Sequence, residues 1–425
     1  MMNRARMLAT ASVLALLGAG AQAGEVRMMW YSDGIEGEVM QDLLNRFMEE
    51  NPDINVTLDN VAYQVIMEQL PIQLASGEGP DIARVTNLKE QAEHWLDLTD
   101  YVEDPEYWRT NFGDQFDWMR PDDSDIIPGF MTQLTLTGGF ANATLFEQAG
   151  VAMPGEGATW EEWVEAATQV QESQQTAGAF SIDRSGHRIT GPMISYGANL
   201  VGEDGKPAPL DDAAKAFITQ LVQWTDEGKN LRDVWVSAAG TTYIPGADEF
   251  INANIPLYYS GSWQIANLST KIGDAFDWVA IGSPCGDAGC TGLPGGAALV
   301  GIKYTQNPED VGKVMDFLAR EDIVKEFSER TLFLPAHKGV VEAGGLNFQT
   351  EDPSAKAALE AFVGFTGTIM PEANAMPAWR YANAVYGGMV NRISQAMAGE
   401  MAVEDIFARI DSDIAEQVAA ADQTK

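Results

Sequence analysis

The hydrophobic pattern in the first sixty residues predicts a strand, a helix and a second strand in succession. Val26 to Trp30 is an apolar run typical of a buried strand, and the polar turn Ser32-Asp33-Gly34 follows it. Apolar residues then recur at helical spacing from Val39 to Met48, until Asn51-Pro52 ends the helix. Ile54 to Leu58 reads as the second strand. Strand–helix–strand units build parallel sheets, so this region predicts an α/β fold.

Similar patterns continue along the chain. Asp81 to Val85 predicts a third strand, and Pro71 in the helical segment before it predicts a kinked or interrupted helix. Thr159 to Glu162 is a capping box, which begins a helix. Further elements are expected as a strand at 297–302 and helices through 311–318, 385–397 and 403–414. We find no internal repeat and no low-complexity linker, so the domains are expected to join through ordered segments.

Composition describes a globular protein with a strongly acidic surface. The chain has 425 residues, of which 45% are hydrophobic and 21% charged. At roughly 150 residues per domain, this length predicts two or three domains. Lys and Arg number 26 against 62 Asp and Glu, a net charge of −36. Such a surface repels phosphate backbones and anionic headgroups, which argues against nucleic-acid and membrane-surface binding.

The N-terminus has the pattern of a secretory signal peptide. Arg4 and Arg6 form a basic region, Met7 to Gly20 is apolar, and Ala21-Gln22-Ala23 is a small-x-small cleavage signal. The apolar run is too short to span a bilayer. We therefore expect residues 1–23 to be a signal peptide cleaved after Ala23, and the protein to be a soluble periplasmic protein without a membrane anchor.

Cysteine and histidine usage predicts a disulfide and no metal site. Cys285 and Cys290 lie in a Gly-rich segment, and in an oxidising compartment we expect them to pair. The three histidines, His94, His187 and His337, lie far apart and show no ligand spacing.

Catalytic motifs are also missing from the sequence. There is no G-x-S-x-G elbow and no H-E-x-x-H, and none of the three Gly-Lys pairs is followed by Ser or Thr, so no phosphate loop is formed. A carboxylate pair for glycoside hydrolysis stays open, because 62 acidic residues allow many pairs. We expect a protein that is not an enzyme and needs no cofactor.

Six groups of segments form a recognisable series along the chain. They are Phe47 to Val56, Leu74 to Ile82, Phe140 to Val151 with Thr159 to Glu162, Phe250 to Leu257 with Gly261 to Trp263, Leu293 to Gly296, and Met370-Pro371 with Met376 to Trp379. In their order and spacing, these segments resemble the extracellular solute-binding proteins of carbohydrate ATP-binding-cassette importers, the family that includes maltose-binding protein. The family usually has Tyr-Asn where this chain has Phe140-Ala141, so a polar contact is expected to be missing there.

The resemblance implies an α/β fold of two lobes, the type II periplasmic-binding-protein fold, in which each lobe is a mixed sheet flanked by helices. It places the ligand cleft between the lobes, which close when ligand binds. We expect the N-terminal lobe to comprise residues 24–133 and 294–345, and the C-terminal lobe residues 134–293 and 346–425. The chain would cross between lobes near 132–136, 292–296 and 345–365.

Ligands of open α/β sheets bind beyond the carboxyl ends of strands, which selects two sets of residues. Ser32 and Asp33 follow the first strand, and Arg84 and Asn87 end the third. Asp33 would accept hydrogen bonds from hydroxyl groups, or it is only a turn residue.

The resemblance adds further candidates. Trp263 matches the family's sugar-stacking tryptophan, and either Trp379 or Arg380 is expected to reach the ligand. Gln133 and Tyr196 would supply polar groups from the second lobe. The pair Gly295 and Gly296 would offer backbone N–H groups or allow the hinge to bend.

Two ligand classes remain open at this point. Arg84 and Arg380 would clamp an anionic sugar derivative or a glycerol phosphodiester, or they would bind neutral hydroxyl groups. We expect a neutral mono- or oligosaccharide or polyol, captured by a monomeric receptor that docks on a membrane permease. A secreted carbohydrate-active enzyme is the remaining alternative.

Overall fold

A computed structural model describes residues 24–237 and 243–423, and the expected signal peptide lies outside this range. Eight strands form one sheet in the order β2-β1-β3-β10-β4-β6-β5, with β7 also paired to β4. In chain order they are β1 Gly24–Tyr31, β2 Ile54–Val61, β3 Ile82–Val85, β4 Gly129–Asn142, β5 Phe180–Ile182, β6 Leu257–Gly261, β7 Trp278–Ile281 and β10 Pro294–Gly301.

The strand–helix–strand unit predicted from the sequence is confirmed. β1 pairs in parallel with β2 and with β3, and α1 (Glu36–Glu50) connects β1 to β2. Val39, Leu43 and Phe47 lie on the buried face of α1 because they are spaced by one helical turn. The helices α12 (Pro308–Ala319) and α13 (Glu321–Thr331) complete the core of this first lobe.

The second lobe is built around the other half of the sheet, where β6 pairs in parallel with β5 and antiparallel with β4. Its core includes residues of α6 (Trp160–Gln174), α7 (Gly186–Ser195), α8 (Asp212–Asp226), α17 (Ala382–Met397) and α18 (Val403–Gln423). The predicted capping box begins α6, with the Thr159 hydroxyl accepting from the Glu162 N–H and the Glu162 carboxylate from the Thr159 N–H.

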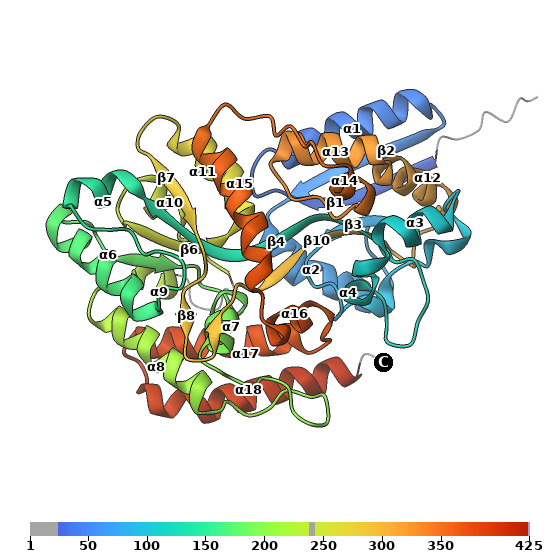
Figure 1. Ribbon diagram of the computed structural model, residues 1–425. Coiled ribbons are helices and arrows are strands. Elements are labelled where there is room, and N and C mark those ends of the chain that lie inside the picture. The colour runs from blue at the N-terminus through green and yellow to red at the C-terminus, as the bar shows by residue number, and fades with distance from the viewer. Residues whose placement is uncertain (1–23, 238–242, 424–425) are drawn as a thin grey trace, which may run out of the picture.

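Strands β4 and β10 connect the two halves, and β4 runs across the middle of the molecule (Figure 1). The first part of β4 pairs with β10, and its last part pairs with β6 and β7. At Gly296 the backbone has φ of 157°, and an added Cβ would lie 2.2 Å from the Gln133 carbonyl oxygen. Glycine is therefore required where the two connecting strands approach each other. The limits of the lobes at residues 133, 293 and 345 stay a prediction.

The remaining elements are short or peripheral. The helix α2 runs through Pro71 without interruption, so of the two expected outcomes, a kinked or an interrupted helix, the interrupted helix is excluded.

The expected disulfide is present: Cys285 and Cys290 form it between β8 and β9, two strands of two residues each. Within the described ranges, no helix combines the length and apolar character needed to cross a membrane. The other helices are α2 Tyr63–Ala75, α3 Pro105–Phe112, α4 Phe116–Met119, α5 Ala143–Ala149, α9 Arg232–Val236, α10 Ala247–Ile251, α11 Ile265–Ile272, α14 Lys338–Ala343, α15 Pro353–Phe365 and α16 Pro371–Ala375, and the two short strands are β8 Cys285–Gly286 and β9 Gly289–Cys290.

Candidate ligand-binding site

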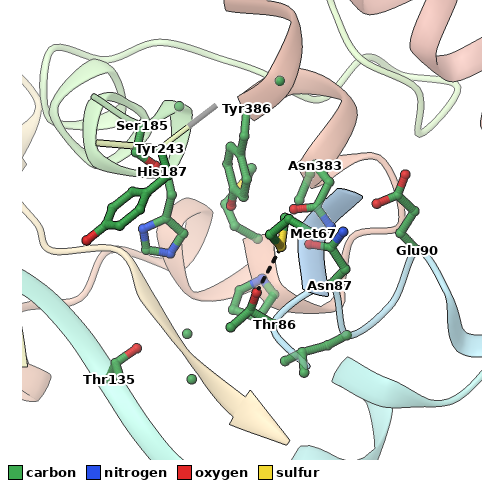
Figure 2. A pocket seen from close by; sticks show the side chains of 18 of the residues that line it. Met67, Thr86, Asn87, Glu90, Thr135, Ser185, His187, Tyr243, Asn383 and Tyr386 are labelled. Atoms are coloured by element: carbon green, nitrogen blue, oxygen red, sulfur yellow. Dashed lines mark hydrogen bonds between the residues drawn. The ribbon is translucent and has the colours of Figure 1, made fainter. Parts of the chain in front are cut away.

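A cavity of about 350 Å³ lies between the two lobes and takes residues from both. This volume is at the lower end of the ~300–1,000 Å³ of known small-molecule pockets. Figure 2 shows Met67, Thr86, Asn87 and Glu90 from the first lobe around the same space as side chains of the second. Those of the second lobe include His187, Ser185, Tyr243, Asn383 and Tyr386.

The first lobe contributes the ends of two parallel strands and one helix. Asp33 follows β1 and Asn87 follows β3, as expected for residues at the carboxyl ends of strands. Tyr31, the last residue of β1, contacts Tyr63 of α2 with ring centroids 4.9 Å apart. The Tyr63 hydroxyl forms a hydrogen bond of 2.9 Å with Thr86, which fixes this aromatic wall.

The wall of the second lobe is dominated by Arg188 and Trp263. The Arg188 guanidinium carbon lies 4.0 Å from the centre of the Trp263 ring, which is a cation–π contact. Tyr243 lies 5.5 Å from the same guanidinium and also meets Tyr63 of the first lobe edge-on at 5.6 Å. The aromatic wall therefore continues from one lobe to the other.

Arg188 is anchored by Asp183, which follows β5 and is fully buried. The Arg188 Nε lies 3.3 Å from the Asp183 carboxylate. That carboxylate also accepts hydrogen bonds from the hydroxyls of Tyr258 and Ser260, both at 2.7 Å, and from the Gly246 N–H at 2.9 Å. Four donors thus hold the buried carboxylate, and its charge balances the guanidinium.

His187 is a neutral bridge between Arg188 and β10. Burial and the neighbouring Arg188 charge lower the pKa of His187 to about 3. A hydrogen bond to the backbone of Pro294 acts in the opposite direction, because it favours the protonated form. Arg188 Nη1 donates to His187 Nδ1 at 3.0 Å. Since Pro294 has no N–H, the histidine donates to the Pro294 carbonyl, and both ring nitrogens are occupied.

Asp33 carries a perturbed carboxylate that faces the cavity. Burial and repulsion from Glu36 raise its pKa from 3.8 to about 6, while the charges of Arg84 and Arg188 act in the opposite direction. Among the described residues, no side chain or N–H donates to this carboxylate. Asp33 in the first lobe and Arg188 in the second therefore present an acceptor and a donor to the same cavity.

Arg84 was expected at the ligand, but the structure places it beneath the cavity wall. Its side chain is fully buried, between the rings of Trp30 at 4.7 Å and Tyr31 at 4.2 Å. It donates to the Tyr31 carbonyl at 2.6 Å, to Glu36 at 3.1 Å and to Gln133 at 2.8 Å. Every second side chain of a strand points to the same face, and at this position that face is the interior.

Three other expected ligand residues do not line the cavity. Ser32 forms a hydrogen bond with Asn60 at 3.3 Å, and the Tyr196 hydroxyl donates to Glu161 at 2.7 Å. Arg380 donates to the Ala421 carbonyl at 3.2 Å and lies near the Asp422 carboxylate. In each case a neighbouring segment of the same lobe holds the side chain. Seven expected residues do line the cavity, namely Asp33, Asn87, Gln133, Trp263, Gly295, Gly296 and Trp379.

Four cavity residues, Arg188, His187, Tyr63 and Tyr243, were not among those expected from the sequence. Arg188 follows β5 by six residues, and β5 has only three residues, too few to form a recognisable pattern. Recognition of this strand would have selected residues 183–188 by the same strand-end argument that selected Asp33. Within residues 24–237 and 243–423, no three His, Cys, Asp or Glu side chains gather as they would around a metal ion.

Comparison with known proteins identifies relatives over most of the chain. A family model described as bacterial extracellular solute-binding protein matches residues 31–325. A putative binding protein of Brucella abortus is 23% identical over 368 residues, which is 79% of this chain and 81% of the relative.

Solved structures share the fold. The GacH receptor of Streptomyces glaucescens, solved unliganded and with acarbose, has a TM-score of 0.74 at 18% identity and covers 91% of this chain and 96% of its own. A Listeria monocytogenes ABC substrate-binding protein in complex with cycloalternan has a TM-score of 0.77 at 17% identity, covering 93% and 99%. Maltose-bound MalE3 of T. maritima has a TM-score of 0.71 at 19% identity, covering 93% and 100%. The two-lobed α/β fold expected from the sequence is thereby confirmed.

Proposed function

The chain belongs to the family of bacterial extracellular solute-binding proteins, and on that premise we propose that it is the receptor for a neutral carbohydrate. In this proposal the protein is exported to the periplasm, captures a sugar or polyol between its lobes and delivers it to the permease of an ABC importer. It binds its ligand without converting it.

The observation that carries the proposal is the opposition of Asp33 and Arg188 in one cavity. A carboxylate only accepts hydrogen bonds and a guanidinium only donates them. A hydroxyl group can donate to Asp33 and accept from Arg188 at the same time. A carboxylate or phosphate group cannot donate to Asp33, and an ammonium group cannot accept from Arg188. The pair therefore favours a ligand whose polar groups are hydroxyls.

The aromatic walls support the same ligand class. Sugars carry apolar C–H faces beside their hydroxyl edges, and aromatic rings bind such faces. Rings line the cavity from both lobes: Tyr31, Tyr63, Tyr243, Trp263, Trp379 and Tyr386. Structural relatives were solved with carbohydrates, among them maltose and mannotriose.

The charges around the cavity argue against the anionic alternative. That alternative rested on Arg84 and Arg380, and neither lines the cavity. The Arg188 charge is balanced by buried Asp183. Lys89 also lines the cavity, but its ammonium donates to the backbone of the 117–120 segment and pairs with Asp122 at 2.9 Å, so its charge is already compensated. An anion would find no uncompensated cation among these groups.

The test is a thermal-shift screen followed by calorimetry. Maltose, mannotriose and D-tagatose represent neutral carbohydrates, and glucuronate and glycerol 3-phosphate represent anions. A ligand present at 100 times its Kd stabilises the folded protein by ~2.7 kcal/mol, which gives a measurable rise in Tm. We expect a neutral compound to raise Tm and Trp263→Ala to abolish the rise.

Trp118→Ala is the matched control, because Trp118 is a half-buried tryptophan that does not line the cavity. The control variant should keep the ligand response. A rise in Tm with the anions alone would refute the assignment to neutral carbohydrates. Conversion of the carbohydrate during calorimetry, seen as continuing heat and new products, would refute the assignment as a receptor.

A further inference from the structure

Beneath the cavity, a buried hydrogen-bond network joins the first strand, the third strand and the connecting strand β4. Its centre is the Arg84 guanidinium, which donates to the Tyr31 carbonyl, to the Glu36 carboxylate and to the Gln133 side chain. Arg84 is 0% and Glu36 is 2% exposed. A buried ion pair of this kind contributes little to stability by itself, because both charges lose their hydration.

The network determines which atoms of Gln133 face the ligand. A guanidinium can only donate hydrogen bonds, so the Gln133 atom at 2.8 Å from Arg84 is the carbonyl oxygen Oε1. The amide nitrogen Nε2 then lies on the other side of the group. Gln133 lines the cavity and is only 3% exposed, and none of the described residues accepts a hydrogen bond from its Nε2.

We infer that Arg84 is a positioning residue that fixes the Gln133 amide so that it offers only hydrogen-bond donors to the bound carbohydrate. The inference rests on the proposed function for the nature of the ligand. Gln133 and Arg188 then both donate into the cavity, and Asp33 accepts there. The ligand must place acceptor oxygens at Gln133 and Arg188 and a hydroxyl proton at Asp33.

The same network supports Asp33. The Glu36 carboxylate accepts a hydrogen bond from Arg84. It also accepts hydrogen bonds from the backbone N–H groups of Asp33 and Gly34, the latter at 2.8 Å. One carboxylate therefore ties the loop that carries Asp33 to the arginine that orients Gln133. The polarity of this part of the cavity depends on residues that do not touch the ligand.

The decisive variant is Gln133→Glu, which preserves the size of the side chain and an oxygen for Arg84 but replaces the cavity-facing NH₂ group by a second oxygen. We expect affinity for the neutral carbohydrates of the screen to fall about tenfold or more, because ligand acceptors would meet a carboxylate. The control is Gln264→Glu. Gln264 is 5% exposed, its Oε1 accepts from Asn267 at 3.0 Å, and it does not line the cavity. Wild-type affinity in Gln133→Glu would overturn the inference.

A second measurement separates this inference from the proposed function. In the unliganded protein, the side-chain amide signal of isotope-labelled Gln133 is followed by NMR in wild type, Arg84→Lys and Arg380→Gln. Lysine keeps the charge but cannot donate to three acceptors in one plane. We expect the Gln133 signal to move in Arg84→Lys and to stay in Arg380→Gln, which removes an arginine outside the cavity. An unchanged signal in Arg84→Lys would overturn the inference, even if no sugar binds to the wild type.

Discussion

Substitution of Asp33 by asparagine should stabilise the unliganded protein at neutral pH and weaken its binding of ligand. The carboxylate faces the cavity, lacks a donor among the described residues and has a pKa raised from 3.8 to about 6 by burial and by repulsion from Glu36. Asparagine has nearly the same shape but no charge. The substitution therefore removes an unfavourable charge without leaving a void.

The raised pKa fixes both the sign and the range of the effect. Above pH 6 the carboxylate is ionised in the folded and in the unfolded protein, and its destabilising effect is fully present. As the pH falls from 6 towards 3.8, the folded state takes up a proton first and the effect disappears. The difference between a pKa of 3.8 and one of about 6 corresponds to at most ~3 kcal/mol, and partial solvent access reduces this to about 1–2 kcal/mol.

The assay is the thermal midpoint of wild type and Asp33→Asn between pH 4 and pH 8. With an unfolding entropy of ~2.1 cal/mol/K per residue, about 400 residues give ~0.8 kcal/mol per degree, so the variant should melt ~1–3 °C higher at pH 8. The difference should vanish near pH 4. Asp274→Asn, at an exposed turn, is the control and should show no such trend. Lower stability of Asp33→Asn at pH 8, or a difference independent of pH, would refute the reasoning.

Three further outcomes are expected. Gly296→Ala should lower Tm by several degrees, because the new Cβ would lie 2.2 Å from a backbone oxygen. Gly364→Ala is the control and should not lower Tm, since an added Cβ there has free space. Equal midpoints for the two variants would contradict the steric argument. Reduction of the Cys285–Cys290 disulfide should cost about 2 kcal/mol, since it closes a short loop, and a large loss of Tm would show a wider role. Asp183→Asn should cost ~3 kcal/mol and abolish sugar binding in calorimetry, because a buried guanidinium loses its counter-charge; unchanged binding would exclude this role.

The fold could be predicted from the sequence because its elements are long and regular. The helix α1 and the strands beside it show their periods over 8 to 15 residues, and the residues that confer them are the buried ones. β5 is different, since its three residues cannot express a period. Short strands are stabilised by their neighbours in the sheet, which a linear pattern does not display.

From the residues alone, the candidate site could be predicted only where a side chain follows directly from its position at a strand end; the other expected residues that line the cavity came from the family resemblance. Asp33 and Asn87 satisfy this condition and line the cavity. Arg84 is one position before the end of β3 and points inward, where Glu36 neutralises it. The two residues are 48 positions apart in sequence, and no spacing rule connects them. Partners brought together by the fold decide whether a charged residue faces the ligand or the interior.

Among the described residues, each lobe contains a buried carboxylate–arginine pair, Glu36–Arg84 in the first and Asp183–Arg188 in the second, and the two pairs are oriented oppositely with respect to the cavity. In the first lobe, both Glu36 and Arg84 are buried, and the nearby acceptor Asp33 lines the cavity. In the second lobe, the carboxylate Asp183 is buried and its partner Arg188 faces the cavity. Asp33 and Arg188 come from different lobes, so a ligand that contacts both of them joins the lobes. A ligand that binds this arrangement more strongly than an open one shifts the equilibrium towards it by that difference in affinity. The buried charges thus leave an acceptor, Asp33, on one lobe and a donor, Arg188, on the other, and a neutral ligand with both donors and acceptors can join them.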